Sequence, residues 1–505
     1  MQIEPSEDAF TDRYDRGEPQ VVWTTMVADL ETPVSAYLKL AGGRAMSFLL
    51  ESVEGGEARG RYSIVGLEPD LIWRTYGKKA EVKRSVRGKS NAFTPLNEPP
   101  LQALRTLIRE SRIVLPDGLP PMAAGIFGYL GYDMVRLMEE LPQANPDPIG
   151  IPDAVLVRPT LIVVFDAVKD AITVVTPVRP EKGVKAKGAL KRAVERLSGI
   201  VNALDRPLVQ SLTEFNEGPL DVPVSSNTTP AEFKAMVLKA KEYIVAGDAF
   251  QIVLAQRFEA PFALPPFSLY RALRRTNPSP YLYFLDFGDF SVAGSSPEIL
   301  VKVSGGIVTI RPIAGTRPRG PTLHEDKAME EELLGDPKER AEHLMLLDLG
   351  RNDVGRVARI GTVNVTDQFF VERYSHVMHI VSNVEGALDE KCDALDALAA
   401  GFPAGTVSGA PKVRAMQIID ELEKEKRGLY AGCVGYFSAA GEMDTCIVLR
   451  TALIKNGTMY VQAGAGIVAD SDPGYEQQEC INKAKALFRA AEEARRFASA
   501  TKRGQ

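Results

Sequence analysis

The chain of 505 residues is long enough for two or more ordinary domains, and its 45% hydrophobic and 25% charged residues are typical of a soluble globular protein. A net charge of -6 gives no electrostatic reason to expect nucleic acid or an anionic membrane as a partner. The chain shows no signal peptide and no apolar run of the ~20 residues that a membrane span needs, so we expect a cytoplasmic protein. Its four cysteines form neither a disulfide framework nor a CxxC pair, which argues against structural zinc.

The N-terminal part reads as one region that follows a polar start. We expect residues 1–20 to be disordered or frayed and residues 21–205 to form this first region. Strands are predicted at 21–28, 45–52, 61–66 and within 155–178. Residues 181–204 read as a basic amphipathic helix. Residues 206–228 mix Pro, Ser, Asn, Glu and Gly without a period, which indicates a linker.

Residues 229–495 are predicted to form a second region of helices and hairpins, before a tail at 496–505. Thr229-Pro-Ala-Glu232 combines a capping box with Pro at the first helical position, and an apolar helical face follows as far as Gly247. Hairpins are predicted to turn at Gly288-Asp289, at Ser304-Gly305-Gly306 and at Asn456-Gly457. Antiparallel hairpins between a few long helices predict an α+β fold.

The Asn456-Gly457 turn also fixes a register. In a two-residue loop, Lys455 pairs with Thr458, and an unbroken strand from 445 to 455 puts Arg450 opposite Ala463. Arg450 then lies beside Gly464-Ala465-Gly466, whose backbone a small anion can approach closely. The pattern fits a site for a small polycarboxylate, or an edge-strand arginine in solvent. Although Gly464–Ala469 matches G-x-G-x-x-A, no helix starts inside it, which excludes a dinucleotide site.

Two pairs of glutamates stand at helical i, i+3 spacing, Glu339 with Glu342 and Glu476 with Glu479. On a helix each pair shares one face, with Cβ atoms about 5–6 Å apart. Four inward-facing carboxylates would suit a hard cation such as Mg²⁺, which prefers oxygen ligands. Two solvated helix faces explain the same spacing.

Taken together, motifs between residues 45 and 490 resemble those of the chorismate-utilising enzymes, and among them the component I of anthranilate synthases. The matching motifs are Leu49-Leu-Glu-Ser52, Asn277-Pro-Ser-Pro-Tyr281, Gly294-Ser-Ser-Pro-Glu298, Arg311-Pro-Ile-Ala-Gly-Thr-Arg317, Glu342-His-Leu-Met-Leu-Leu-Asp-Leu-Gly-Arg-Asn-Asp353, Tyr374-Ser-His-Val-Met-His379, Pro403-Ala-Gly-Thr-Val-Ser-Gly-Ala-Pro411 and Gln462-Ala-Gly-Ala-Gly466. The resemblance implies two packed, largely antiparallel sheets flanked by helices, with a regulatory region at 21–205 and a chorismate-binding region at 229–495.

The resemblance also assigns roles by motif position. It implies Mg²⁺ held by Glu342 and Glu479, with Glu339 and Glu476 in support, against the ring carboxylate of chorismate. The backbone of Gly464, Ala465 and Gly466 is expected to hold that same carboxylate region together with Thr406, and Lys483 to balance charge near the metal. Tyr430 and Arg450 are expected to bind the enolpyruvyl carboxylate. For catalysis it implies Glu298 as the general acid to the leaving 4-hydroxyl and His379 as a helper in the proton removal that aromatises the ring.

Two positions distinguish this chain from related enzymes that catalyse other reactions. Isochorismate and salicylate synthases carry a lysine base where Gln251 stands, and an amide cannot deprotonate water, which favours ammonia as the nucleophile. Aminodeoxychorismate synthases carry a nucleophilic lysine where Ala314 stands, which favours direct amination.

The resemblance therefore predicts a lyase that makes anthranilate and pyruvate from chorismate, the first committed step of tryptophan biosynthesis. It implies a hetero-oligomer in which a separate glutamine amidotransferase supplies the ammonia. It also implies feedback inhibition by tryptophan bound at Glu51, Ser52, Pro280 and Tyr281. The alternatives are an aminodeoxychorismate synthase component I of the folate pathway and a catalytically silent scaffold for an amidotransferase.

Overall fold

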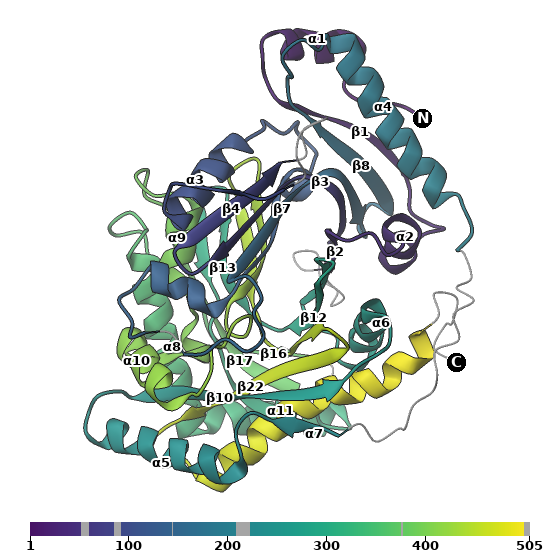
Figure 1. Cartoon of the computed structure of the whole chain (residues 1–505). Helices are drawn as coiled ribbons and strands as arrows, with labels where there is room; N and C mark the ends of the chain where they lie inside the picture. Colours follow the sequence, from purple (N-terminus) through teal and green to yellow (C-terminus); the bar gives the residue numbers. More distant parts are fainter. Residues whose placement is uncertain (52–59, 85–91, 144, 209–222, 375–376, 499–505) are drawn as a thin grey trace.

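Antiparallel strands joined edge to edge form the scaffold of the protein (Figure 1). The computed structural model describes residues 1–51, 60–84, 92–143, 145–208, 223–374 and 377–498, and in these residues the sheet has 22 strands. The predicted α+β class with antiparallel sheets is confirmed. The two expected sheets are continuous with each other, because strands of the N-terminal region join them.

The N-terminus is ordered, so the expectation of a frayed segment at 1–20 is wrong. Helix α1 (Glu7–Asp15) is capped by Ser6, and its Phe10 and Tyr14 are buried one turn apart. The side-chain amide of Gln20 donates to the Phe10 carbonyl oxygen at 2.8 Å. Two aromatic anchors in a polar stretch therefore fix this helix to the core.

An outlying part at the top of Figure 1 contains α1 and α2 (Pro33–Ala41) together with the antiparallel pair β1 (Gln20–Val27) and β8 (Ala171–Val178). Helix α4 (Ala186–Leu204) covers this pair, as its amphipathic sequence predicts. One hydrophobic core lies between these helices, α6 (Pro266–Thr276) and α11 (Pro473–Glu493).

Strands of the N-terminal region pair with strands of the C-terminal region. β2 (Ser47–Glu51) pairs with β11 (Tyr281–Asp286), and β6 (Gly125–Leu130) pairs with β19 (Cys433–Ser438). The long strands β3 (Tyr62–Tyr76) and β7 (Ala154–Asp166) connect β2 to β6 through a ladder of their own. The regions 21–205 and 229–495 therefore share one sheet.

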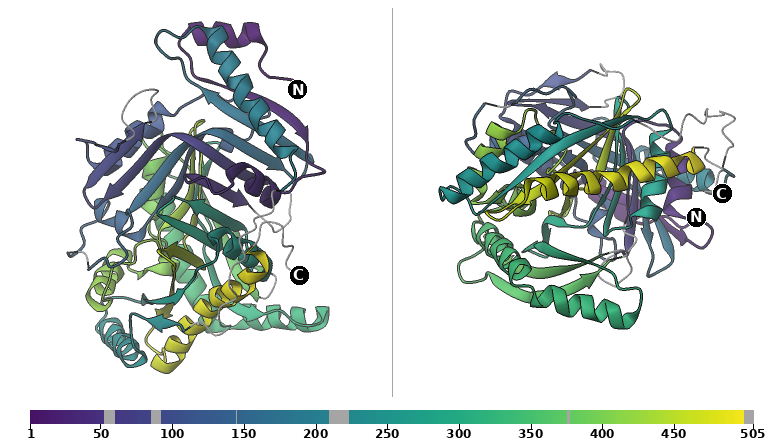
Figure 2. Two further views of the ribbon diagram at one scale, coloured as in Figure 1. Left: turned by 45° about the vertical axis from the view of Figure 1, so that its right-hand side comes forward. Right: turned by 90° about the horizontal axis from the view of Figure 1, so that it is seen from below.

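Below this sheet, α5 (Pro230–Val245) and α11 lie side by side under β10 (Gln251–Pro261) and β22 (Thr458–Ile467), as the view from below in Figure 2 shows. The predicted capping box of α5 is present, with Thr229 and Glu232 bonded to each other's backbone N–H. The predicted linker at 206–228 contains a short strand, β9 (Ser225–Ser226), which pairs with β10. Residues 209–222 of the linker lie outside the described ranges. Of the predicted tail at 496–505, Phe497 is buried, and residues 499–505 are not described.

The predicted hairpin turns are present. β11 turns into β12 (Phe290–Ser296), β13 (Ile299–Ser304) into β14 (Ile307–Ile310), and β21 (Thr451–Lys455) into β22. Asn456 and Gly457 both have positive φ, as a two-residue turn of this kind requires, and Lys455 pairs with Thr458.

The expected single strand from 445 to 455 is wrong. The chain forms β20 (Met443–Ile447) and β21 instead, which pair with different strands. Arg450 lies between them with φ +47, a left-handed conformation that interrupts a strand. At this break the chain passes from the part of the sheet that contains β13 and β19 to the part that contains β12 and β22.

The remaining elements of the described chain cover or extend the sheet. The helices are α3 (Pro100–Glu110), α7 (Leu323–Gly335), α8 (Pro337–Gly355), α9 (Ala394–Gly401) and α10 (Lys412–Leu422), with short 3₁₀ turns η1 (Pro121–Ala123), η2 (Tyr132–Leu137), η3 (Gly405–Val407) and η4 (Ala494–Phe497). The strands are β4 (Lys79–Arg84), β5 (Thr94–Pro95), β15 (Ile313–Pro318), β16 (Asn364–Arg373), β17 (Val377–Ala387) and β18 (Gly409–Ala410). Among all described helices, none combines the length and the apolar character that crossing a membrane requires.

Candidate active site

Both glutamate pairs lie at the start of a helix. Asp336 caps α8 by accepting from the Lys338 and Glu339 amides at 2.9 and 3.3 Å, and Asp472 caps α11 by accepting from the Tyr475 amide at 2.8 Å. Each helix has Pro at its first position, so the two pairs fall in the first two turns. An ion pair of 3.1 Å between Lys338 and Asp470 ties the two helix starts together.

The structure brings the two pairs within electrostatic range, since Glu342 senses the charges of Glu339 and Glu479, and Glu476 senses that of Glu479. Burial raises the pKa of Glu342, and the negative charges of Glu339 and Glu479 raise it further. Burial also raises the pKa of Glu476, with Glu479 adding to the shift. The alternative of two unrelated solvated helix faces does not fit this arrangement.

Three of the four acids bond to other side chains of the protein. Glu342 accepts from the Gln251 side-chain amide at 3.0 Å, Glu339 from Arg317 at 3.1 Å, and Glu479 pairs with Lys483 at 2.7 Å. Within the described ranges no three His, Cys, Asp or Glu side chains are gathered closely enough to enclose a metal ion. The donor chemistry, four hard oxygen ligands that repel one another, nevertheless fits a divalent cation.

The glycines of β22 lie against β10, with Gly464 opposite Ala255 and Gly466 opposite Val253. On the other edge the ladder to β21 ends at Val461, so among the described strands the segment 462–467 has β10 alone as its neighbour. An open strand edge of this kind offers backbone groups to a ligand.

Both glycines have close neighbours, which at Gly464 include a backbone oxygen and at Gly466 only the end of the flexible Gln251 side chain. A Cβ on Gly464 would come within 2.8 Å of the Tyr430 hydroxyl and of the Leu254 carbonyl oxygen, and a Cβ on Gly466 within 2.7 Å of Gln251 Nε2. Lys483 Nζ donates to the Gly464 carbonyl oxygen at 2.9 Å. The predicted residues Tyr430, Gln251 and Lys483 therefore surround this strand.

Arg450 does not lie opposite Ala463, because the β21 ladder ends before it. Its left-handed backbone places it at the crossing between β20 and β21, where its carbonyl oxygen accepts from the Ser295 amide at 3.1 Å. Its positive charge contributes to the lowered pKa of His379, which puts the guanidinium near that ring.

Glu298 is a buried acid between β12 and β13, with 6% of its surface exposed. Burial raises its pKa to about 8, although the Thr406 hydroxyl, which donates to Oε1 at 3.2 Å, and the Ile313 backbone N–H favour the charged form. Glu298 is thus protonated at neutral pH and has the proton that a general acid needs. Thr406 in η3 contacts this carboxyl group as well as standing near the predicted anion site.

His379 in β17 is held as a neutral base. Its Nδ1 lies 2.9 Å from the Gly315 carbonyl oxygen and 3.0 Å from the Thr316 hydroxyl. A carbonyl oxygen only accepts, so Nδ1 carries the hydrogen and Nε2 carries the lone pair. Burial lowers the pKa of the ring to about 4, and the buried Nε2 has no protein partner in the described chain. That atom is free to accept a proton from a substrate.

A second location gathers the residues of the expected effector site. Glu51, Pro280 and Tyr281 line a cavity of about 770 Å³. The Glu51 carboxylate accepts from the Tyr270 hydroxyl at 2.5 Å and from Arg274 Nε, and the Tyr281 hydroxyl donates to Asp444 at 3.1 Å. Ser52 lies outside the described residues.

Sequence reasoning missed several residues that hold this site together. Arg317 pairs with Glu339, the Lys338–Asp470 ion pair joins the helix starts, and the Gly315 carbonyl oxygen sets the tautomer of His379. Arg427, which contacts the ring of Tyr430, was also missed. These contacts join residues far apart in the chain, and no spacing rule reveals them. For Arg317 and Gly315 a signal existed, because both lie in the matched motif Arg311–Arg317.

Comparison with known proteins gives a consistent result. Residues 47–489 match the family of chorismate binding enzymes. Anthranilate synthase component 1 of Cereibacter sphaeroides is 58% identical over 492 residues, which cover 97% of this chain and 98% of the relative. The protein of the same description from Aquifex aeolicus is 48% identical over 471 residues, 93% of this chain and 94% of its own length.

Solved structures extend the comparison to the fold. Anthranilate synthase component I from Streptococcus pneumoniae superposes with a TM-score of 0.74 at 40% identity, over 92% of this chain and 99% of that one. The menaquinone-specific isochorismate synthase of Escherichia coli has a TM-score of 0.69 at 20% identity, over 96% of this chain and 98% of that one, and shares the fold.

Proposed function

The chain belongs to the chorismate binding enzymes and, among them, to the anthranilate synthases, and on this basis we propose that it converts chorismate and ammonia to anthranilate and pyruvate with Mg²⁺. This is the first committed step of tryptophan biosynthesis. The observation that carries the proposal is a neutral buried acid, Glu298, in the same region as a neutral base, His379, whose Nε2 lacks a protein partner in the described chain.

Two groups of residues bind the two carboxylates of chorismate. The open edge of β22 at Gly464, Ala465 and Gly466 receives the ring carboxylate, with Thr406 beside it. Tyr430 and Arg450 bind the enolpyruvyl carboxylate. Two anchors at opposite ends of a rigid ring fix its orientation before any bond changes.

The reaction then needs one proton donor and one acceptor. Ammonia adds at C2 while the 4-hydroxyl takes the proton of Glu298 and leaves as water, and the new ammonium group on C2 then returns one proton to the Glu298 carboxylate. His379 Nε2 assists loss of the C2 proton as the C3–O bond breaks, which leaves the aromatic ring of anthranilate, and the departing enolpyruvate takes up one proton at its methylene carbon to become pyruvate. A neutral histidine suits this step because its lone pair is available.

The residue that faces the attacking nucleophile is an amide. The Gln251 side chain donates to Glu342 at 3.0 Å and has no basicity with which to activate water. Ammonia is already a nucleophile and needs no such base. Ala314 in β15 offers no amine that could attack C2 covalently.

Glu342 and Glu479, near the starts of α8 and α11, would be the direct ligands of Mg²⁺, and Glu339 and Glu476 would support them. When bound, the ion supplies positive charge that holds and polarises the ring carboxylate. The protein's part is to bring together partly buried acids: burial raises the pKa of Glu342 and Glu476, neighbouring carboxylates raise it further, and a divalent cation would favour the charged forms.

We assign the source of ammonia to a glutamine amidotransferase subunit in a hetero-oligomer. The relatives carry the description component 1, which implies a further component. We further propose tryptophan as a feedback inhibitor in the 770 Å³ cavity lined by Glu51, Pro280 and Tyr281, where an acid suits the ammonium group of an amino acid.

Product analysis tests the proposed function. Purified protein is incubated with chorismate, ammonium chloride and Mg²⁺, and the products are followed by anthranilate fluorescence and by mass spectrometry. We expect equal amounts of anthranilate and pyruvate. A product that keeps its enolpyruvyl group would show an aminodeoxychorismate synthase, and unchanged chorismate would show a scaffold.

A further inference from the structure

Arg427 is a buried guanidinium that reaches three parts of the proposed substrate site. It is 4% exposed and lies in the loop after α10. Its Nη1 donates to the Val407 carbonyl oxygen at 2.6 Å, and its Nη2 donates to the Val253 carbonyl oxygen at 2.6 Å. Its Cζ lies 5.5 Å from the centre of the Tyr430 ring. One planar group therefore contacts η3, β10 and a substrate-binding tyrosine.

Glu423 also bonds to the backbone of β10. The carboxylate pairs with Arg427 at 2.6 Å, and its Oε1 also accepts from the Ala255 amide at 2.9 Å. Val253 and Ala255 are the residues that pair with Gly466 and Gly464 across the ladder. The ion pair thus satisfies the backbone of β10 directly behind the two glycines, where no other described strand does so.

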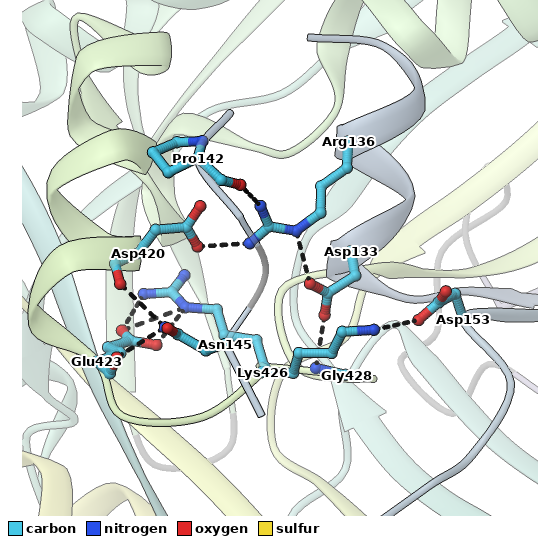
Figure 3. Close-up of polar contacts among 10 residues, drawn as sticks. Asp133, Arg136, Pro142, Asn145, Asp153, Asp420, Glu423, Lys426 and Gly428 are labelled. Atoms are coloured by element: carbon cyan, nitrogen blue, oxygen red, sulfur yellow. Dashed lines mark hydrogen bonds and ion pairs between the residues drawn. The ribbon is translucent and has the colours of Figure 1, made fainter. Parts of the chain in front are cut away.

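A polar network fixes the loop that carries this pair, and Figure 3 shows its members pointing toward one another. Asn145 donates to the Glu423 and Asp420 carbonyl oxygens at 2.7 and 2.9 Å. Arg136 donates to the Asp420 carboxylate at 2.7 Å, and Asp133 accepts from the Gly428 amide at 3.2 Å. Residues of the N-terminal region therefore bond to the chain on both sides of Arg427.

We propose that Arg427 is a positioning residue that sets the spacing between the two carboxylate anchors of the substrate site. Through Val253 it holds the strand opposite Gly466, and through Val407 it holds the turn that carries Thr406. Its guanidinium also lies near the ring of Tyr430, as it does near that of Tyr132. The inference rests on the proposed function, because that function assigns these groups to the two ends of chorismate. A lysine cannot replace it, since one ammonium group lacks the planar fork that serves these acceptors.

The test compares two variants with a matched control. Arg427→Lys keeps the charge opposite Glu423 but loses the fork. The double variant E423Q/R427M removes both charges together, which avoids leaving one buried charge unpaired and so keeps the fold. The control is Arg257→Lys, a buried arginine on the same strand that pairs with Glu425 at 2.5 Å and whose contacts, within the described residues, reach neither η3 nor Tyr430.

We measure kcat and KM for chorismate at saturating ammonium and Mg²⁺, the KM for ammonium, and thermal unfolding. Both Arg427 variants should raise the KM for chorismate at least 10-fold and leave the KM for ammonium within twofold, whereas Arg257→Lys should change neither. A normal KM with a reduced maximal rate that follows the folded fraction would overturn the inference. Failure of the wild-type protein to form anthranilate would instead overturn the proposed function.

Discussion

Replacing Glu298 with Gln should stabilise the protein at the same time as it removes the proposed general acid. Glu298 is buried, and burial raises its pKa from 4.5 to about 8. Between these two values the unfolded chain has lost the proton that the folded chain still holds. Folding therefore takes up a proton, and the stability contributed by this group is complete below pH 4.5 and lost as the pH rises through 8.

The size of the effect follows from the shift. One pKa unit corresponds to about 1.4 kcal/mol, so the shift from 4.5 to about 8 costs on the order of 5 kcal/mol once both states are ionised. Between pH 5 and pH 8 the loss is about 3.5 kcal/mol. Glutamine does not titrate, and its side-chain oxygen can still accept the Thr406 hydroxyl that bonds Oε1 at 3.2 Å. The free energy of unfolding of the variant should therefore not show this decrease between pH 5 and pH 8.

Urea unfolding of both proteins at pH 5, 6, 7 and 8 measures this effect. The free energy of unfolding of Glu298→Gln relative to wild type should rise by about 3.5 kcal/mol across this range. Its kcat for anthranilate formation should fall by about 10²–10⁴-fold, the usual contribution of a general acid. A stability difference that does not change with pH would refute the buried, protonated state of Glu298, and near-normal turnover would refute its catalytic role.

Three further predictions concern the metal, the anion site and the effector site. Glu479→Gln should raise the Mg²⁺ concentration for half-maximal activity at least 10-fold without lowering the melting temperature, and an unchanged Mg²⁺ requirement would exclude Glu479 as a ligand. Gly464→Ala should lower kcat/KM for chorismate about 10–100-fold, because the new Cβ would come within 2.8 Å of the Tyr430 hydroxyl and a backbone oxygen; normal kinetics would show that this strand does not contact substrate. Tyr281→Phe, which loses the hydrogen bond to Asp444, should weaken inhibition by tryptophan several-fold, and equal inhibition of both proteins would place the effector elsewhere.

Local signals in the sequence predict the elements that depend on local chemistry. The hairpin at Asn456-Gly457 follows from two residues that accept positive φ, and the start of α5 follows from the Thr229 and Glu232 capping box. The same reasoning failed at Arg450, an arginine with positive φ that no local pattern predicts. It failed also at α1, because a polar stretch hid the two aromatic residues that anchor the helix.

The candidate site, too, could be predicted only in part from the sequence. Spacing puts each glutamate pair on one helix face, but only the fold shows that the two helix starts meet at the Lys338–Asp470 ion pair. Family motifs point to Glu298 and His379, whereas the protonation of each depends on burial that the fold creates. Long-range contacts such as that of Arg427 with Val253 have no local signature, since they join segments 174 residues apart.

The central claim is that a protonated Glu298 and a neutral His379 act on one substrate. The pH dependence of kcat/KM for chorismate tests it directly, provided that total ammonium is adjusted to keep free ammonia constant. We predict a level profile from pH 5 to pH 7 and a fall above about pH 8 as Glu298 loses its proton, since its pKa is raised to about 8 and that of His379 is lowered to about 4. A rate that keeps rising through pH 9 would contradict the account.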